Sequence, residues 1–125
     1  MTQCSFTPPL VALGVKKGTL SHEMITHGKV FSVNILAKDQ KSLAEHFVKP
    51  AQGHADVKLA GIAHHAGKTG APILDEAIAF FECEVREMAN GAGDHALVIG
   101  EVVEAGVRQD VEALTLKDTG WHYGG

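Results

Sequence analysis

The stretch that decides the fold is Ala79–Val107, which reads AFFECEVREMA, then NGAGD, then HALVIGEVVEAGV. From Phe81 and Cys83 onward, apolar side chains alternate with charged ones, the period-two pattern of a half-buried strand. Residues 96–103 form a second and more apolar run. The Gly, Asn and Asp cluster at 90–94 between them is typical of a turn. The sequence therefore predicts a long antiparallel hairpin.

The bulk properties of the chain exclude several classes of protein. A chain of 125 residues predicts one domain with one core. A net charge of −4 and an isoelectric point of about 6.0 argue against nucleic acid as a partner, because no basic stripe is present. No apolar run has the length of a membrane span, and the first residues do not show the basic and apolar regions expected of a secretory leader. The two cysteines, Cys4 and Cys83, have no metal spacing, so a cytoplasmic location is expected.

The rest of the chain predicts further short strands around the hairpin, with few helices. Extended segments are expected at 2–9, 10–15, 30–37, 58–62, 112–116 and 121–123, and short helices at 22–27 and 40–47. Ser21 and Asp39 are the expected N-caps of the helices. Residues 48–57 predict a loop, and residues 67–70 a turn. Roughly seven strands joined by short connections predict a mainly β barrel or sandwich.

Two motifs that suggest chemistry do not fit their usual patterns. Gly67-Lys68-Thr69 invites interpretation as a phosphate-binding loop, but the first glycine of that motif would stand at position 62, which is Ile62. The eight histidines have no zinc spacing, so no metal site is predicted.

The acidic residues of the first hairpin strand are Glu82, Glu84 and Glu87. A solvated strand face is the expected reading, and a carboxylate site the less favoured alternative.

A more coherent set of polar residues surrounds the first predicted helix. Ser21 opens that helix, and helix N-termini bind phosphate through free backbone amides. Lys16 and Lys17 lie just before it, and Ser32 and Asn34 share one face of the following strand. Together they predict a site for a phosphorylated ligand. The alternatives are that Ser21 only caps the helix and that Asn34 is a buried amide bonded to neighbouring backbone.

The order of the motifs along the chain resembles that of the flavin reductase-like, FMN-binding split-barrel proteins. Flavoredoxins and the reductase modules of diflavin proteins are the nearest comparison. The matching motifs are Thr2–Val11, Ser21–Ile25, Gly28–Leu36, Lys58–Ile62, Gly70–Leu74 and Gly93–Val102. They cover nearly the whole chain. Members of the family carry further strands before the segment that matches Thr2, so the resemblance implies a domain over 1–125 that lacks the usual first strands.

The resemblance implies an antiparallel split β-barrel that forms a homodimer, with FMN near the subunit interface. It implies an NAD(P)H-linked flavin reductase, or a flavoredoxin-like electron carrier with a redox partner protein. The flavin would carry the chemistry and the protein would orient it. The alternatives are a split-barrel dimer that binds flavin or another ligand without turnover, and a truncated structural module without a cofactor.

The resemblance also assigns roles to individual residues. Ser21 stands where the family usually has a Thr that contacts the FMN phosphate or ribityl chain. His95 matches the His of a Gly-Asp-His motif near the flavin ring, where nicotinamide docks, and a solvent-exposed turn histidine is the alternative. The predicted cofactor-binding residues are Thr2, Gln3, Lys17, Ser21, Asn34 and Lys58, and the predicted catalytic residue is His95.

Overall fold

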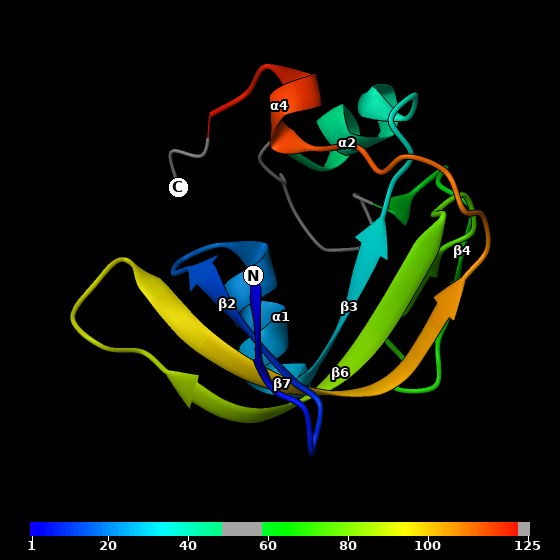
Figure 1. The fold of residues 1–125 in the computed structure, drawn as a ribbon. Helices are drawn as coiled ribbons and strands as arrows, with labels where there is room; N and C mark the ends of the chain where they lie inside the picture. Colours follow the sequence, from blue (N-terminus) through cyan, green and yellow to red (C-terminus); the bar gives the residue numbers. More distant parts are fainter. Residues whose placement is uncertain (49–58, 123–125) are drawn as a thin grey trace.

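The computed structural model describes residues 1–48 and 59–122. Its centre is the predicted hairpin, formed by β6 (Ala79–Ala89) and β7 (His95–Val107). The two strands pair antiparallel from one end to the other, and two β-bulges interrupt the register. Bulges increase the local twist and bend of a ribbon, and the hairpin is visibly curved in Figure 1. The hairpin predicted from the alternating pattern is confirmed.

Five of the described strands form one antiparallel sheet in the order β1–β2–β7–β6–β3. The other three members are β1 (Thr2–Ser5), β2 (Leu10–Lys16) and β3 (Val30–Ile35). A separate two-stranded ribbon consists of β4 (His64–Ala66) and β5 (Pro72–Leu74). The predicted mainly β, antiparallel fold class is confirmed. Strands β1 and β3 form the two edges of the five-stranded sheet.

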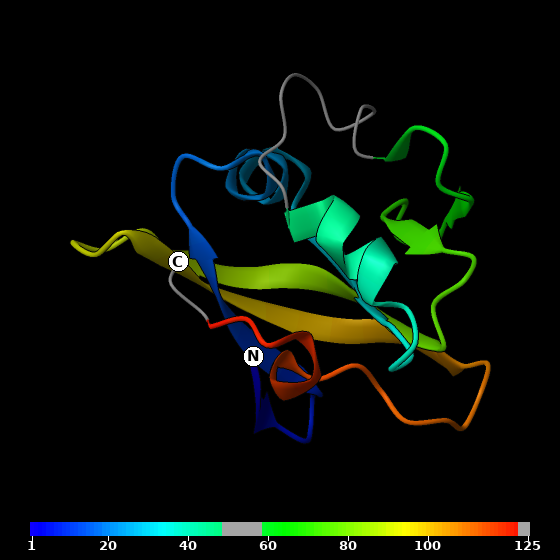
Figure 2. The ribbon, with the colours of Figure 1, turned by 90° about the horizontal axis from the view of Figure 1, so that it is seen from above.

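Three helices are described: α1 (Leu20–Gly28), α2 (Lys41–Val48) and the short α4 (Leu116–Thr119). Seen from above, α1, α2 and the β4–β5 ribbon lie on the same side of the long hairpin (Figure 2). None of the described helices has the length and apolar character needed to cross a bilayer.

The main hydrophobic core lies between α1 and the sheet. Its buried members are Val15, Ile25, Phe31, Cys83 and Val98. Gly100 on β7 is required by this packing, because a Cβ at that position would lie 2.6 Å from the Phe31 ring. The apolar positions of α1, β2, β3, β6 and β7 thus meet in one cluster, which fixes α1 against the sheet.

The structure corrects several local predictions. Thr19, not Ser21, is the N-cap of α1, since its hydroxyl accepts the His22 N–H. Helix α2 begins at Lys41, and the carbonyl of Gln40, rather than of Asp39, accepts its first amides.

Three predicted strands are also wrong in their described residues. Residues 59–62 form a helical turn and bend instead of a strand. The strand predicted at 112–116 is replaced by one isolated bridge and the start of α4, because Thr115 and Asp118 make a capping box that begins a helix. Residues 121 and 122 are not in a strand, and most of the loop predicted at 48–57 lies outside the described residues.

Candidate functional site

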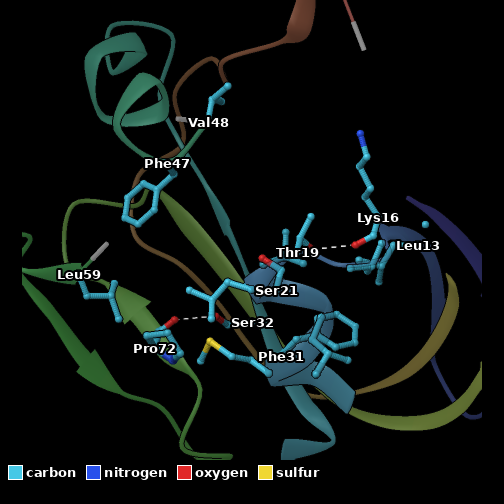
Figure 3. Close-up of a pocket in the computed structure, with 16 residues that line it drawn as sticks. Leu13, Lys16, Thr19, Ser21, Phe31, Ser32, Phe47, Val48, Leu59 and Pro72 are labelled. Carbon is cyan, nitrogen blue, oxygen red and sulfur yellow. Dashed lines mark hydrogen bonds between the residues drawn. The ribbon is translucent and has the colours of Figure 1, made fainter. Parts of the chain in front are cut away.

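A pocket of about 640 Å³ opens between α1 and β3 (Figure 3). The end of β2, the first turn of α1, the middle of β3, the end of α2 and the start of β5 all contribute to its walls. The described lining side chains include Leu13, Lys16, Thr19, Ser21, Phe31, Ser32, Val33, Phe47, Val48, Leu59 and Pro72. Most of them are apolar, and the hydroxyls gather on α1 and β3. This composition suits a ligand with a flat apolar part and a polar tail.

The polar end of the pocket is the N-terminus of α1. The Thr19 hydroxyl donates to the Lys16 carbonyl at 2.7 Å and accepts from the His22 N–H at 3.2 Å. The Thr19 carbonyl accepts the Glu23 N–H, so the N–H groups of Leu20 and Ser21 have no acceptor from their own helix. Free amides and the helix dipole favour an anion there. Ser21 therefore lies where the sequence places a phosphate contact, although it is not the cap.

The opposite wall is built by a hydrogen-bond network between β3 and β5. The Ser32 hydroxyl donates to the Pro72 carbonyl at 2.5 Å, and both residues line the pocket (Figure 3). The Asn34 side chain donates to Ser32 and to Pro72, and its oxygen accepts from the Leu74 N–H at 2.9 Å. Asn34 is not among the described residues that line the pocket. Its contacts match the alternative weighed from the sequence, an amide bonded to neighbouring backbone.

Lys17 faces the tip of the long hairpin. Its ammonium donates to the carbonyls of Asn90 and Gly91, and its backbone N–H donates to the Asp94 carbonyl at 2.9 Å. The His22 ring also bonds Asn90, with 2.8 Å between Nε2 and Oδ1. These contacts join the start of α1 to the β6–β7 turn, so Lys17 holds the hairpin tip in the described structure.

His95 begins β7 and bonds the residue before it. Its Nδ1 lies 2.9 Å from Asp94 Oδ1, although neighbouring strand residues usually point to opposite faces. The bond to His95 is the main cause that lowers the pKa of Asp94 below its usual value. His95 shares its side of β7 with the half-exposed Leu97, whereas Ala96 is fully buried. It is not among the described residues that line the pocket.

The remaining predicted contacts lie elsewhere. Thr2 and Gln3 are exposed on β1, at the edge of the sheet, where their side chains donate to nearby backbone carbonyls among the described residues. Lys58 lies outside the described residues. Within the described residues, no group of three His, Cys, Asp or Glu is arranged to hold a metal ion.

The structure contradicts the prediction that Glu82, Glu84 and Glu87 form one solvated face. Glu82 is 1% exposed, and its carboxylate accepts three hydrogen bonds from Lys68 and Thr69. Burial alone would raise the pKa of Glu82, but the bonds from Thr69 and Lys68 and the Lys68 charge lower it below its usual value. Glu84 is half-exposed and pairs with Arg86, and Glu87 is exposed.

A sequence signal for the buried Glu82 exists. The Gly67–Gly70 segment fails as a phosphate-binding loop, yet its backbone amides do bind an anion, the carboxylate of the chain's own Glu82. Gly-rich turns whose amides converge form such anion-binding concavities. The amides of this turn therefore bind an internal carboxylate, and the rejection of a phosphate-binding loop stands.

Comparison with known proteins gives a consistent answer. The family described as "Flavin reductase like domain" matches residues 1–125. A flavin reductase of Pseudomonas putida is 31% identical over 124 residues, which cover 99% of this chain and 69% of that protein. A putative diflavin flavoprotein of Nostoc is 35% identical over 127 residues, covering 98% of this chain and 22% of that protein.

Solved structures agree with the sequence comparison. The NADH:FAD oxidoreductase of Streptomyces globisporus superposes with a TM-score of 0.73 at 31% identity, over 85% of this chain and 63% of that one. The chain thus spans from about a fifth to about two thirds of these relatives. The family match over the whole chain, the antiparallel fold and the pocket beside α1 agree, and the chain belongs to the flavin reductase-like domain family.

Proposed function

We propose that this chain binds a flavin in the pocket beside α1 and acts as a flavin reductase or as the electron-transfer module of a larger flavoprotein. The observation that carries the proposal is the joining of an apolar pocket to a free helix N-terminus in a member of this family. The pocket volume of about 640 Å³ lies within the usual range for cofactor-sized ligands. FMN is the proposed flavin, whereas the Streptomyces relative is described as using FAD.

The residues present fit the parts of a flavin. The amides of Leu20 and Ser21 would receive the phosphate, with the Ser21 hydroxyl as a further donor. The apolar walls, including Leu13 and Phe47, would exclude water from the ring. When bound, the flavin supplies the redox chemistry by accepting electrons from reduced nicotinamide, NADH or NADPH.

The position of His95 supports a homodimer as part of the proposal. His95 and the half-exposed Leu97 lie on the side of β7 away from the buried Ala96. A second copy that covers this side would bury Leu97 and bring its own residues next to His95. The exposed edge strand β1 is a further surface that pairing would protect. In this arrangement His95 would donate a hydrogen bond to the nicotinamide or to a flavin carbonyl.

A second candidate is a module that receives electrons from a protein partner. The match to a putative diflavin flavoprotein supports this candidate, because the matched region is only 22% of that longer protein. In either case residues 1–125 would form one split-barrel domain. The two free cysteines, Cys4 and Cys83, support the expected cytoplasmic location.

The experiment is reconstitution followed by reduction. Purified protein is titrated with FMN and with FAD, and the complex is mixed with NADH or NADPH without oxygen while flavin absorbance is followed. Bleaching by a nicotinamide supports the reductase. Binding without bleaching supports a module that needs a partner, and no binding of either flavin contradicts the proposal. Sedimentation of the same sample tests the dimer, which a stable monomer at micromolar concentration would contradict.

A further inference from the structure

The carboxylate of Glu82 is buried, and Glu82 is not among the described residues that line the pocket. Its Oε1 accepts from the Thr69 N–H at 2.9 Å and from the Thr69 hydroxyl at 2.7 Å, and its Oε2 accepts from the Lys68 N–H at 3.0 Å. Burying a charge is costly unless it is well bonded. These bonds all come from the turn between β4 and β5, so Glu82 fixes that turn to the first half of β6.

The turn is shaped around the carboxylate. A Cβ at Gly67 would lie 2.3 Å from Glu82 Oε1, so that only glycine allows the backbone to pass so closely. The Thr69 hydroxyl, which donates to Glu82, accepts the Ala71 N–H at 3.2 Å, and Gly67 and Ala71 are joined by a backbone bond of 2.9 Å. The conformation of the whole 67–71 turn is thus tied to one side chain.

The turn continues directly into the pocket wall. Pro72 follows Ala71, lines the pocket, and accepts the hydrogen bond of the Ser32 hydroxyl (Figure 3). Ser32 in turn is the residue opposite Glu82 in the β3–β6 register. Glu82 is therefore connected to the Ser32–Pro72 wall twice, once through the turn and once through the sheet.

We propose that Glu82 is a positioning residue that holds the 67–71 turn and thereby places the Ser32–Pro72 wall for the bound flavin. The effect of Glu82 on flavin binding rests on the proposed function, whereas its effect on the 67–71 turn does not. Glu82 contacts no ligand itself. Its effect passes through Thr69 and Pro72, and a purely stabilising role would leave flavin affinity unchanged.

The main test compares Glu82→Gln with Glu84→Gln, a matched change two residues away on the same strand. The amide of Gln can replace only one carboxylate oxygen, and its NH₂ would face a donor, Lys68 N–H or Thr69 N–H. Amide hydrogen exchange of residues 67–71 is measured without flavin, and the dissociation constant for FMN is measured with it. We expect faster exchange and about tenfold weaker FMN binding in E82Q, the effect of losing one charge-assisted hydrogen bond, and wild-type values in E84Q.

Thr69 supplies a second pair of variants in case E82Q does not fold. Thr69→Val keeps the shape of the side chain but removes the hydroxyl that bonds Glu82 and Ala71. Thr69→Ser keeps that hydroxyl. We expect T69V to bind FMN more weakly than the parent protein and T69S to bind FMN with the affinity of the parent protein.

Two results would overturn the inference in distinguishable ways. Wild-type FMN affinity in E82Q or T69V, with FMN bound by the parent protein, removes the positioning role and leaves the proposed function intact. A parent protein that binds no flavin refutes both, and the exchange data then show only whether Glu82 fixes the turn.

Discussion

Thr69 donates both its backbone N–H and its hydroxyl to the same oxygen of Glu82, at 2.9 and 2.7 Å. The pairing joins a residue of a surface turn to a side chain that is 1% exposed. It holds the glycine-rich turn against β6, and it predicts that the stability of the protein depends on the protonation of Glu82.

The first prediction concerns acid stability. The pKa of Glu82 lies below its usual value of 4.5 in the folded protein, so the unfolded chain binds more protons in that range. The contribution of Glu82 to stability is therefore complete above about pH 4.5 and is lost as the pH falls through the lowered pKa. The free energy of unfolding, measured with urea, should fall between pH 6 and pH 3, and the fall should be smaller in E82Q than in the parent protein. E84Q is the control and should show the same fall as the parent protein. An equal loss of unfolding free energy in E82Q and the parent protein would disprove the stabilising role of the ionised Glu82.

The second prediction separates the helix cap from the phosphate contact. Ser21→Ala should weaken FMN binding by about 1–2 kcal/mol, the size of a charge-assisted hydrogen bond, with little change in melting temperature. Thr19→Ala should instead destabilise the protein by about 1 kcal/mol, because Thr19 caps α1. Calorimetric titration and thermal melting of both variants give the comparison. An unchanged FMN affinity in S21A would leave Ser21 without a role in the site.

The third prediction concerns His95. His95→Ala should slow flavin reduction by NADH or NADPH about threefold to tenfold, the effect of one lost hydrogen bond, with FMN affinity nearly unchanged. His27→Ala is the matched control, because His27 lies near the end of α1 and bonds only the Glu23 carbonyl among the described contacts. Stopped-flow reduction checks both. A rate in H95A equal to that of the parent protein would remove His95 from the reaction.

The fourth prediction concerns the thiols. Burial raises the pKa of Cys83 to about 11, and the side chain is 0% exposed, whereas Cys4 is exposed on β1. Thiolates, not thiols, react with alkylating reagents. Iodoacetamide at pH 8 should therefore label Cys4 alone, and Cys83 should be labelled only in denaturant. Mass spectrometry of the labelled peptides is the measurement, and rapid labelling of Cys83 in the native protein would contradict its place in the core.

The sequence predicts those parts of the fold that depend on local pattern. The alternation in Ala79–Ala89 and the turn residues after it specify the hairpin, because side-chain period and turn chemistry are local properties. The beginning of α4 was predictable too, since Thr115 and Asp118 have the spacing of a capping box. The strand proposed there followed composition and missed that signal.

The buried state of Glu82 could not be read from its strand. In the pattern it is equivalent to Glu84, and only the β4–β5 turn, from another part of the chain, covers it. The separation of His95 from the pocket has the same origin, because it depends on which side of β7 packs against α1. The prediction of Ser21 as the N-cap was wrong by two positions, because the sequence offers two hydroxyl residues before the helix and the structure uses Thr19, which leaves Ser21 in the first turn.

The most direct test of the account is to block the pocket from the first turn of α1. Ser21 is exposed and lines the pocket, so Ser21→Trp should fill the proposed flavin site without disturbing the core. Glu23→Trp places the same bulk on an exposed position of the same helix outside the described pocket lining. Titration of FMN is the one measurement. The account predicts one bound FMN per chain in the parent protein and in E23W, and none in S21W. Binding to S21W at parental affinity, or no binding of FMN or FAD to the parent protein, would contradict it.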